Sequence, residues 1–140
     1  MKCMIDTNII LDVFLGQEPF YTSSREVLSL CEAKKIQGFI SASSATDIYY
    51  IVRKRLGNPD KAYDALGHVL NIVKVLSVTN NDVHIAFQRR AKDFEDCLLA
   101  TCARSGKCEA IITRNKEDFR EFGIELLTPE ELIARLQGQQ

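Results

Sequence analysis

Short apolar runs in this chain alternate with longer stretches in which apolar residues recur every three or four positions. Runs of the first kind predict buried strands, and stretches of the second kind predict amphipathic helices. Strands are expected at about residues 3–5, 39–41, 75–78, 110–113 and 125–127, with helices between them. Such alternation predicts a parallel sheet covered on both faces. We therefore expect an α/β fold, a three-layer α/β/α sandwich with a mostly parallel central sheet, formed by residues 1–140 as a single domain.

The helix starts are predicted from side chains that commonly accept a hydrogen bond from the first helical turn. Such residues stand at Thr7 or Asn8, Thr22 or Ser23, Ser43 or Ser44, Asn80, Asp93 and Thr128. Pro129, which directly follows Thr128, suits the first position of the last helix. A shorter helical turn is expected from about residue 115 to 122.

Composition and charge narrow the class of protein only slightly. Hydrophobic residues make up 46% of the chain and charged residues 26%, which is ordinary for a globular protein. The net charge of −1 gives no overall attraction to nucleic acid or to a membrane. Because no apolar run approaches transmembrane length and no signal peptide precedes the first strand, we expect a cytoplasmic protein. The five cysteines, odd in number and without Cys-x-x-Cys spacing, suit reduced thiols in that compartment.

Four acidic residues stand at similar places along the expected fold. Asp6 ends the first strand, and Asp47 lies in the first turn of the helix after the second strand. Asp96 lies in the first turn of the helix capped by Asp93, and Asp118 in the first turn after the fourth strand. Three of them follow strands at the carboxyl edge, which is where open α/β sheets bind ligands. Right-handed crossovers bring these three to one end of the sheet.

Taken singly, these acids are explained by helix capping. Asp47, Asp96 and Asp118 each lie three residues after a potential cap, and the helix dipole stabilises such an acid by roughly 0.3–1 kcal/mol. Taken together, converging carboxylates would repel one another unless a cation neutralises them. Oxygen-only ligands suit Mg²⁺ or Mn²⁺ rather than zinc. Such ions assist phosphoryl chemistry by activating water and offsetting charge on phosphate oxygens.

The neighbours of Asp96 differ in their expected directions. Successive helical residues are about 100° apart, so the directions of Asp93 and Asp96 differ by only about 60°. Glu95 is expected to point away from both, although its longer side chain has the length to reach back. We therefore expect Asp96 to be the direct metal ligand and Asp93 to take an outer position.

Several segments together resemble the PIN domain, in the expected order and over essentially the whole chain. They are IDTN at 5–8, TDIYYI at 46–51, DFEDCLLA at 93–100, ITRNKEDF at 112–119 and GIELLTPEEL at 123–132. Small single-domain members of this kind resemble the VapC-like toxin ribonucleases of toxin–antitoxin pairs. The resemblance implies a PIN-like fold and a hydrolase, a metal-dependent endoribonuclease that cleaves RNA phosphodiesters with Mg²⁺ or Mn²⁺ as cofactor.

The resemblance also implies roles for individual residues. The catalytic and metal-binding carboxylates would be Asp6, Asp47, Asp96 and Asp118. The supporting polar residues would be Asn8, Thr113 and Asn115. Asp47 departs from the family pattern, because the second carboxylate is usually Glu and Asp is one methylene shorter. A homodimer and a small antitoxin protein as partner, in a type II toxin–antitoxin system, are further implications of the resemblance.

RNA contacts are less firmly indicated by the sequence. Arg114 and Lys116 flank the acidic edge and are the preferred candidates for phosphate contacts. The other basic residues, such as Arg53 and Arg89, are better explained as solvated helix ends. Two other functions remain open at this stage. One is a non-catalytic PIN-like module that binds RNA or protein, and the other is a PIN nuclease that acts in RNA processing or on DNA.

Overall fold

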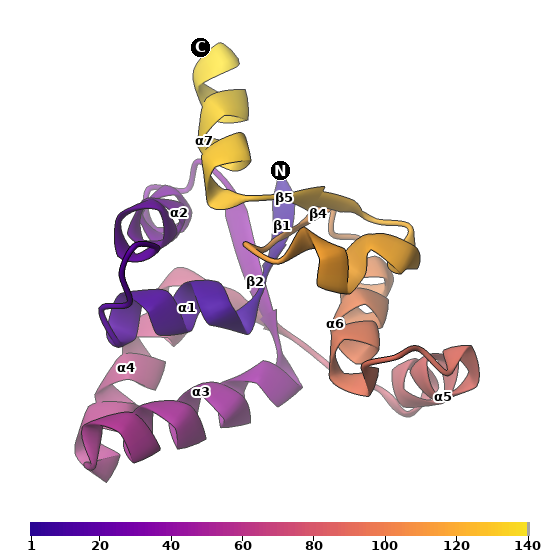
Figure 1. Ribbon diagram of the computed structural model, residues 1–140, viewed down its shortest axis with the longest axis horizontal. Helices are drawn as coiled ribbons and strands as arrows, with labels where there is room; N and C mark the ends of the chain where they lie inside the picture. The colour runs from indigo at the N-terminus through magenta and orange to yellow at the C-terminus, as the bar shows by residue number, and fades with distance from the viewer. Residues whose placement is uncertain (140) are drawn as a thin grey trace.

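The computed structural model describes residues 1–139 and contains a five-stranded sheet at its centre (Figure 1). The strands are β1 (Lys2–Ile5), β2 (Gln37–Ser41), β3 (Lys74–Leu76), β4 (Ala110–Ile112) and β5 (Glu125–Leu127). They lie in the order β3-β2-β1-β4-β5, and every neighbouring pair is parallel. The predicted α/β sandwich is therefore confirmed.

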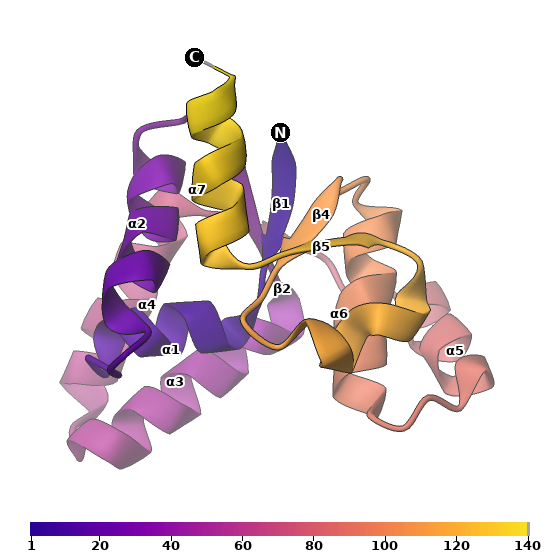
Figure 2. The ribbon, with the colours of Figure 1, turned by 45° about the horizontal axis from the view of Figure 1, so that its top comes forward.

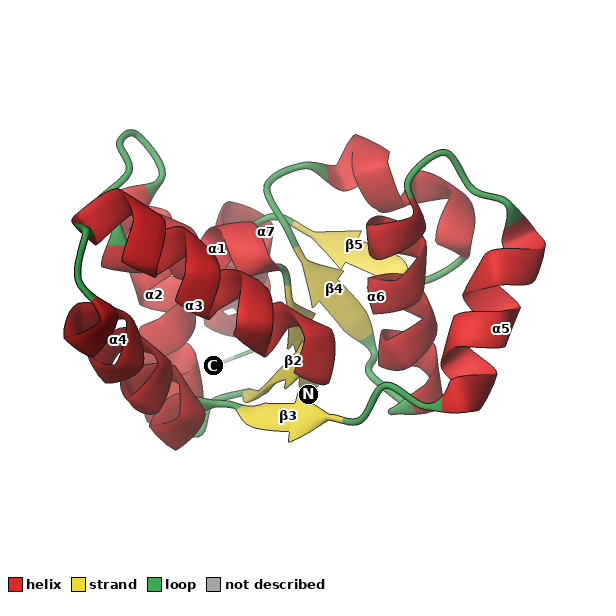
Figure 3. Cartoon of the chain, turned by 90° about the horizontal axis from the view of Figure 1, so that it is seen from below, coloured by secondary structure: helices red, strands yellow, loops and turns green. Residues whose placement is uncertain are grey.

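Helices cover both faces of this sheet, as the view in Figure 3 shows. One layer consists of α1 (Thr7–Phe14), α2 (Tyr21–Glu32), α3 (Ala42–Leu56), α4 (Pro59–Ile72) and α7 (Pro129–Gly138). The other consists of α5 (Asn80–Arg89), α6 (Phe94–Ser105) and the 3₁₀ helix η1 (Lys116–Phe122). Figure 2 shows α5 and α6 on the opposite side of the sheet from α2 and α4.

The two layers arise because successive strand residues point to opposite faces. In β1, Cys3 and Ile5 pack with the larger helical layer, whereas Met4 packs with α5, α6 and η1. In β4, Ile112 and Ile111 divide in the same way. These strands therefore read as continuous apolar runs, which is typical of strands buried on both faces.

The direction in which successive strands are added to the sheet changes between β1 and β4. From β1 the chain proceeds to β2 and β3 on one side, and it then crosses to β4 and β5 on the other. Ligands in open α/β sheets bind beside the carboxyl ends of the strands at such a switch point. Asp6 directly follows β1 at this place, and Thr113 directly follows β4.

Several predicted helix starts were wrong by one to three residues, because the observed cap position lies earlier in the chain than the predicted one. Asp6 occupies the cap position of α1 without a side-chain cap bond, and Ser41 caps α3 by accepting a hydrogen bond from the Ser44 amide. Asp47 consequently lies beyond the first turn, which contains no acid. Thr79 rather than Asn80 caps α5, and Phe20 occupies the cap position of α2.

Two expectations from composition can be compared with the structure. All five cysteines are free and buried. No helix within residues 1–139 is long and apolar enough to cross a membrane.

Candidate active site

Asp6 is the acid at the centre of the site. Its backbone amide continues the pairing of β1 with β4 by donating to the Ile112 carbonyl at 3.0 Å, so its position is fixed by the sheet. Its side chain is only 7% exposed, and one carboxylate oxygen accepts a 2.9 Å hydrogen bond from the Thr113 hydroxyl. Burial raises the pKa of Asp6 above its ordinary value, against the lowering effect of the Thr113 hydrogen bond.

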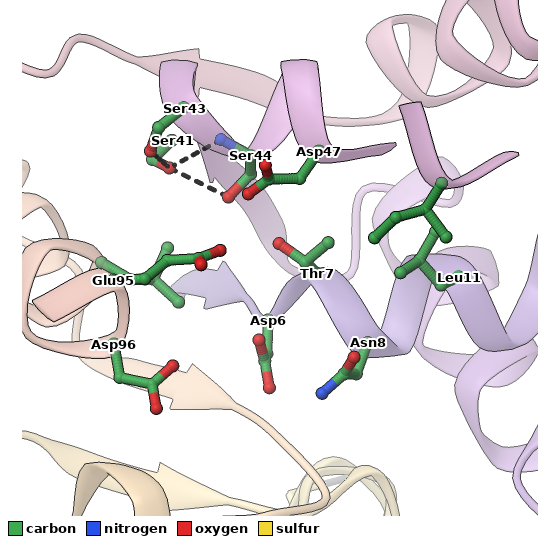
Figure 4. Close-up of a pocket in the computed structure, with 12 residues that line it drawn as sticks. Asp6, Thr7, Asn8, Leu11, Ser41, Ser43, Ser44, Asp47, Glu95 and Asp96 are labelled. Atoms are coloured by element: carbon green, nitrogen blue, oxygen red, sulfur yellow. Dashed lines mark hydrogen bonds between the residues drawn. The ribbon is translucent and has the colours of Figure 1, made fainter. Parts of the chain in front are cut away.

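A cavity of about 250 Å³ opens beside Asp6 (Figure 4). Its walls come from α1, α3 and α6 together with the end of β2. The polar residues that line it are Asp6, Thr7, Asn8, Ser41, Ser43, Ser44, Asp47, Glu95 and Asp96. The cavity thus brings together three of the four predicted carboxylates with the predicted supporting residue Asn8.

Asp47 and Glu95 approach the cavity from opposite walls, α3 and α6 (Figure 4). A hydrogen bond with Asp47 is the largest cause that raises the pKa of Glu95, which reaches about 7. Partial burial and the negative charges of Asp47, Asp93 and Asp96 act in the same direction. The direction expected from the helical angle was therefore wrong, and the open alternative holds: the longer side chain of Glu95 reaches back, across the cavity to Asp47.

Asp96 lies on α6 beside Asp6, half-buried at the cavity wall. Asp93 caps this helix by accepting a 3.0 Å hydrogen bond from the Asp96 amide, as predicted. The pKa of Asp96 is raised to about 6, chiefly by burial and then by the negative charges of Asp93, Asp6 and Asp118. Because three other carboxylates act on this one group, negative charge is concentrated in one region of the site.

Asp118 lies at the edge of this region rather than in it. It is in the first turn of η1, as predicted, but it is exposed and does not line the cavity. Its charge nevertheless reaches Asp96. Asn115 does not cap η1 through its side chain, but its backbone amide donates a 3.0 Å hydrogen bond to the Thr113 hydroxyl oxygen.

Three serines in the cavity wall were not anticipated as site residues. Ser41 is fully buried, and its hydroxyl lies 3.0 Å from that of Ser43 and 2.9 Å from that of Ser44. The signal that could have found them is their position directly at the carboxyl end of β2, next to Asp6 in the sheet. Their hydroxyls can donate to an anionic oxygen that enters the cavity.

Arg114 and Lys116 both have protein partners. Arg114 forms two hydrogen bonds with the carboxylate of the buried residue Asp12, at 3.1 and 3.2 Å. Lys116 pairs with the partly exposed Glu131 at 2.8 Å. A solvent-exposed pair of the second kind contributes only about 0–1 kcal/mol, so Lys116 can exchange its partner for a phosphate. The fixed pairing of Arg114 makes such an exchange far more costly.

The donor set of the cavity fits a hard divalent cation. Its charged groups are carboxylates and its neutral ones are hydroxyls and an amide, which are ligands that Mg²⁺ and Mn²⁺ prefer. Within residues 1–139, no group of three or more His, Cys, Asp or Glu side chains is already arranged to hold a metal ion. Ligation would therefore require these carboxylates to rotate toward a common point.

Comparison with solved structures shows the same fold in proteins of low sequence identity. VapBC2 from Rickettsia felis, bound to a DNA fragment from its promoter, has a TM-score of 0.70 at 17% identity, over 91% of this chain and 98% of that one. VapC20 from Mycobacterium tuberculosis, a sarcin–ricin loop cleaving toxin, has a TM-score of 0.69 at 16% identity, over 87% and 95%. A toxin–antitoxin complex from Klebsiella pneumoniae has a TM-score of 0.65 at 22% identity, over 91% and 97%. At such identities the likeness establishes the fold alone.

Comparison of the sequence itself gives the family. No curated protein matches the chain at a significant level. A family model described as the PIN domain matches residues 2–117, which is most of the chain and ends one residue before Asp118. The chain belongs to the PIN domain family.

Proposed function

We propose that this protein is a ribonuclease that uses Mg²⁺ or Mn²⁺ to hydrolyse RNA phosphodiesters. The observation that carries the proposal is the gathering of Asp6, Asp47, Glu95 and Asp96 around one cavity at the switch point of the sheet. They come from three separate segments of the chain, namely the residue after β1, helix α3 and helix α6. Their mutual repulsion is unfavourable in the absence of a cation. A surface that only binds RNA gains nothing from such an arrangement, because phosphates are also anionic.

The residues divide the proposed work between them. Asp6 and Asp96 would hold the cation, with Asp118 beside them and Asp47 assisting from α3. When bound, such an ion activates water and offsets the charge that develops on phosphate oxygens. Thr113 orients the Asp6 carboxylate. The hydroxyls of Ser41, Ser43 and Ser44, together with Asn8, can form hydrogen bonds with the entering phosphate. The recessed position of the cavity favours flexible single-stranded or looped RNA over a rigid duplex.

We also infer a role as the toxin of a toxin–antitoxin pair, with a small antitoxin protein and a homodimeric assembly. The support is the likeness of the fold to one protein described as a toxin and to another described as a toxin–antitoxin complex. The surface adds support, because Tyr50 and Tyr63 are 64% and 63% exposed and belong to one aromatic cluster with Tyr49. Large exposed apolar side chains of this kind are common where proteins associate.

The proposed activity is tested with purified protein and a single-stranded RNA. We expect cleavage with Mn²⁺, none with EDTA, and none for Asp96→Asn in either condition. Asp60→Asn is the matched control, since Asp60 is likewise an acid in the first turn of a helix but lies in α4. Cleavage that persists in EDTA, or that Asp96→Asn retains in full, would contradict the proposal.

A further inference from the structure

Asp12 and Arg114 form a largely buried ion pair close to the proposed site, and none of the roles above uses it. Asp12 lies on α1 and is 0% exposed. Both of its carboxylate oxygens accept hydrogen bonds from the Arg114 guanidinium, and one of them also accepts a 2.9 Å bond from the Ser24 hydroxyl. The guanidinium carbon lies 4.0 Å from the centre of the Phe20 ring. Contacts with α1 and with the start of α2 therefore fix the guanidinium.

Stability alone is a weak explanation for this pair. Removing two charges from water is costly, and apolar residues of similar volume often give a fold that is as stable or more so. A bidentate pair of this kind does, however, define one relative position of the segments that carry it. Here those segments are α1 and the loop that follows β4.

The same two segments carry the hydrogen bond at the centre of the site. Helix α1 begins directly after Asp6, and Arg114 directly follows Thr113. The Thr113 hydroxyl donates to Asp6 at 2.9 Å and accepts from the Asn115 amide at 3.0 Å. The turn from 113 to 115 therefore faces Asp6 through Thr113, while the side chain of Arg114 ties it to Asp12.

We propose that the Asp12–Arg114 pair is a positioning clamp, which keeps the Thr113 hydroxyl aligned on Asp6 and thereby sets the affinity of the site for its divalent cation. The inference rests on the proposed function, because it concerns the same cation site. Residues that orient a metal ligand typically change metal affinity about tenfold to a hundredfold when they are removed. Arg114 is thus a positioning residue rather than a ligand of the cation.

The test is a calorimetric titration of the full chain with Mn²⁺, well below the melting temperature. We expect Arg114→Met to raise the Mn²⁺ dissociation constant about tenfold. Asp12→Asn combined with Arg114→Met leaves no unpaired buried charge, so it should regain melting temperature while its Mn²⁺ affinity stays low. The control is Arg135→Met. Arg135 forms a similar bidentate pair with Glu125, at 2.7 and 2.8 Å, and breaking it should leave the Mn²⁺ affinity unchanged.

A double-mutant cycle between Arg114 and Thr113 separates a positioning role of Arg114 from an effect on general stability. If the clamp acts through Thr113, Arg114→Met should weaken Mn²⁺ binding in the wild type but add little in a Thr113→Val background. Wild-type Mn²⁺ affinity in both Arg114→Met and the Asp12→Asn, Arg114→Met double variant would overturn the inference and leave the proposed function standing. Full additivity with Thr113→Val would also overturn it. A wild type that binds no Mn²⁺ would overturn the proposed function together with the inference.

Discussion

The hydroxyl of Thr113 donates a 2.9 Å hydrogen bond to a carboxylate oxygen of Asp6, although the two residues are 107 positions apart in the chain. The parallel pairing of β1 with β4 brings them together, because both residues directly follow the ends of these neighbouring strands. Asp6 is largely buried, so the direction of its carboxylate is set by few partners. A threonine that follows one strand thus orients the acid that follows another.

Replacing Thr113 by valine should weaken both the fold and the cation site. The substitution removes a hydrogen bond to a buried carboxylate, which typically costs about 1–3 kcal/mol of unfolding free energy. The lost donor also favours the protonated form of Asp6, so Mn²⁺ affinity at neutral pH should fall. Urea unfolding and Mn²⁺ titration measure the two effects.

Thr101→Val is the control for this prediction, since the Thr101 hydroxyl is also buried but bonds only the Cys97 carbonyl of its own helix. An equal loss of Mn²⁺ affinity in both variants would refute a specific role for Thr113.

Glu95 provides a prediction that the sequence did not suggest. Because it shares a hydrogen bond with Asp47 and lies among other acids, Glu95→Gln should weaken Mn²⁺ binding. In EDTA above neutral pH, the same change should raise the melting temperature by roughly 1–3 °C, because one repelling charge is gone. Glu130→Gln is the matched control, since Glu130 also lies in a first helical turn, that of α7. A Glu95→Gln variant that melts lower than the wild type in EDTA would count against this account of the cavity.

The raised pKa of Asp96 predicts how stability depends on pH in the metal-free protein. The folded state holds the Asp96 proton up to its raised pKa of about 6, whereas the unfolded state loses it near the ordinary aspartate pKa of 3.8. Between these values the folded state binds more protons, so stability falls as pH rises. Urea unfolding in EDTA across this range should show the decline in the wild type and a smaller one in Asp96→Asn. Parallel pH curves for the two proteins would show that Asp96 does not experience the charges around it.

The strands of the sheet and the position of Asp6 could be predicted from the sequence, because both follow from the pattern of apolar residues. Buried parallel strands are continuous apolar runs, and the residue that ends such a run lies at the binding edge of the sheet. This placed Asp6 correctly, and the cap at Asp93 placed Asp96. The position of Asp47 was less accurate, because Ser41 caps α3 from the last position of β2 and so starts the helix earlier.

The remaining features depend on tertiary contacts that local spacing does not encode. The helical angle of Glu95 indicated a side chain pointing away, but a glutamate reaches far enough to meet Asp47 from another helix. The partner of Arg114 was equally hidden, since Asp12 is the one charged residue of the largely apolar helix α1 and the two are 102 positions apart.

Lys116 remains the basic residue from which we predict an RNA contact. Its ion pair with Glu131 is partly exposed, so Lys116→Ala should change the free energy of unfolding by no more than about 1 kcal/mol. RNA binding should weaken, and the slope of log affinity against log salt should become shallower by about 0.7 for a single strand. Filter binding of an RNA to the Asp96→Asn protein over a range of salt concentrations measures this without cleavage. An unchanged slope would show that the RNA backbone does not contact Lys116.

The central claim is that Asp6, Asp96 and their acidic neighbours form one cation site. Its most direct test is a set of melting curves for wild type, Asp96→Asn and the control Asp60→Asn, each in EDTA and in Mn²⁺. Mn²⁺ at a hundredfold excess over its dissociation constant should stabilise the wild type and Asp60→Asn by about 2.7 kcal/mol. We predict that Asp96→Asn melts higher than the wild type in EDTA, because a repelling charge is removed, and that it responds much less to Mn²⁺. If Asp96→Asn instead melts lower in EDTA and still responds fully to Mn²⁺, Asp96 serves only the helix and the proposed cation site is wrong.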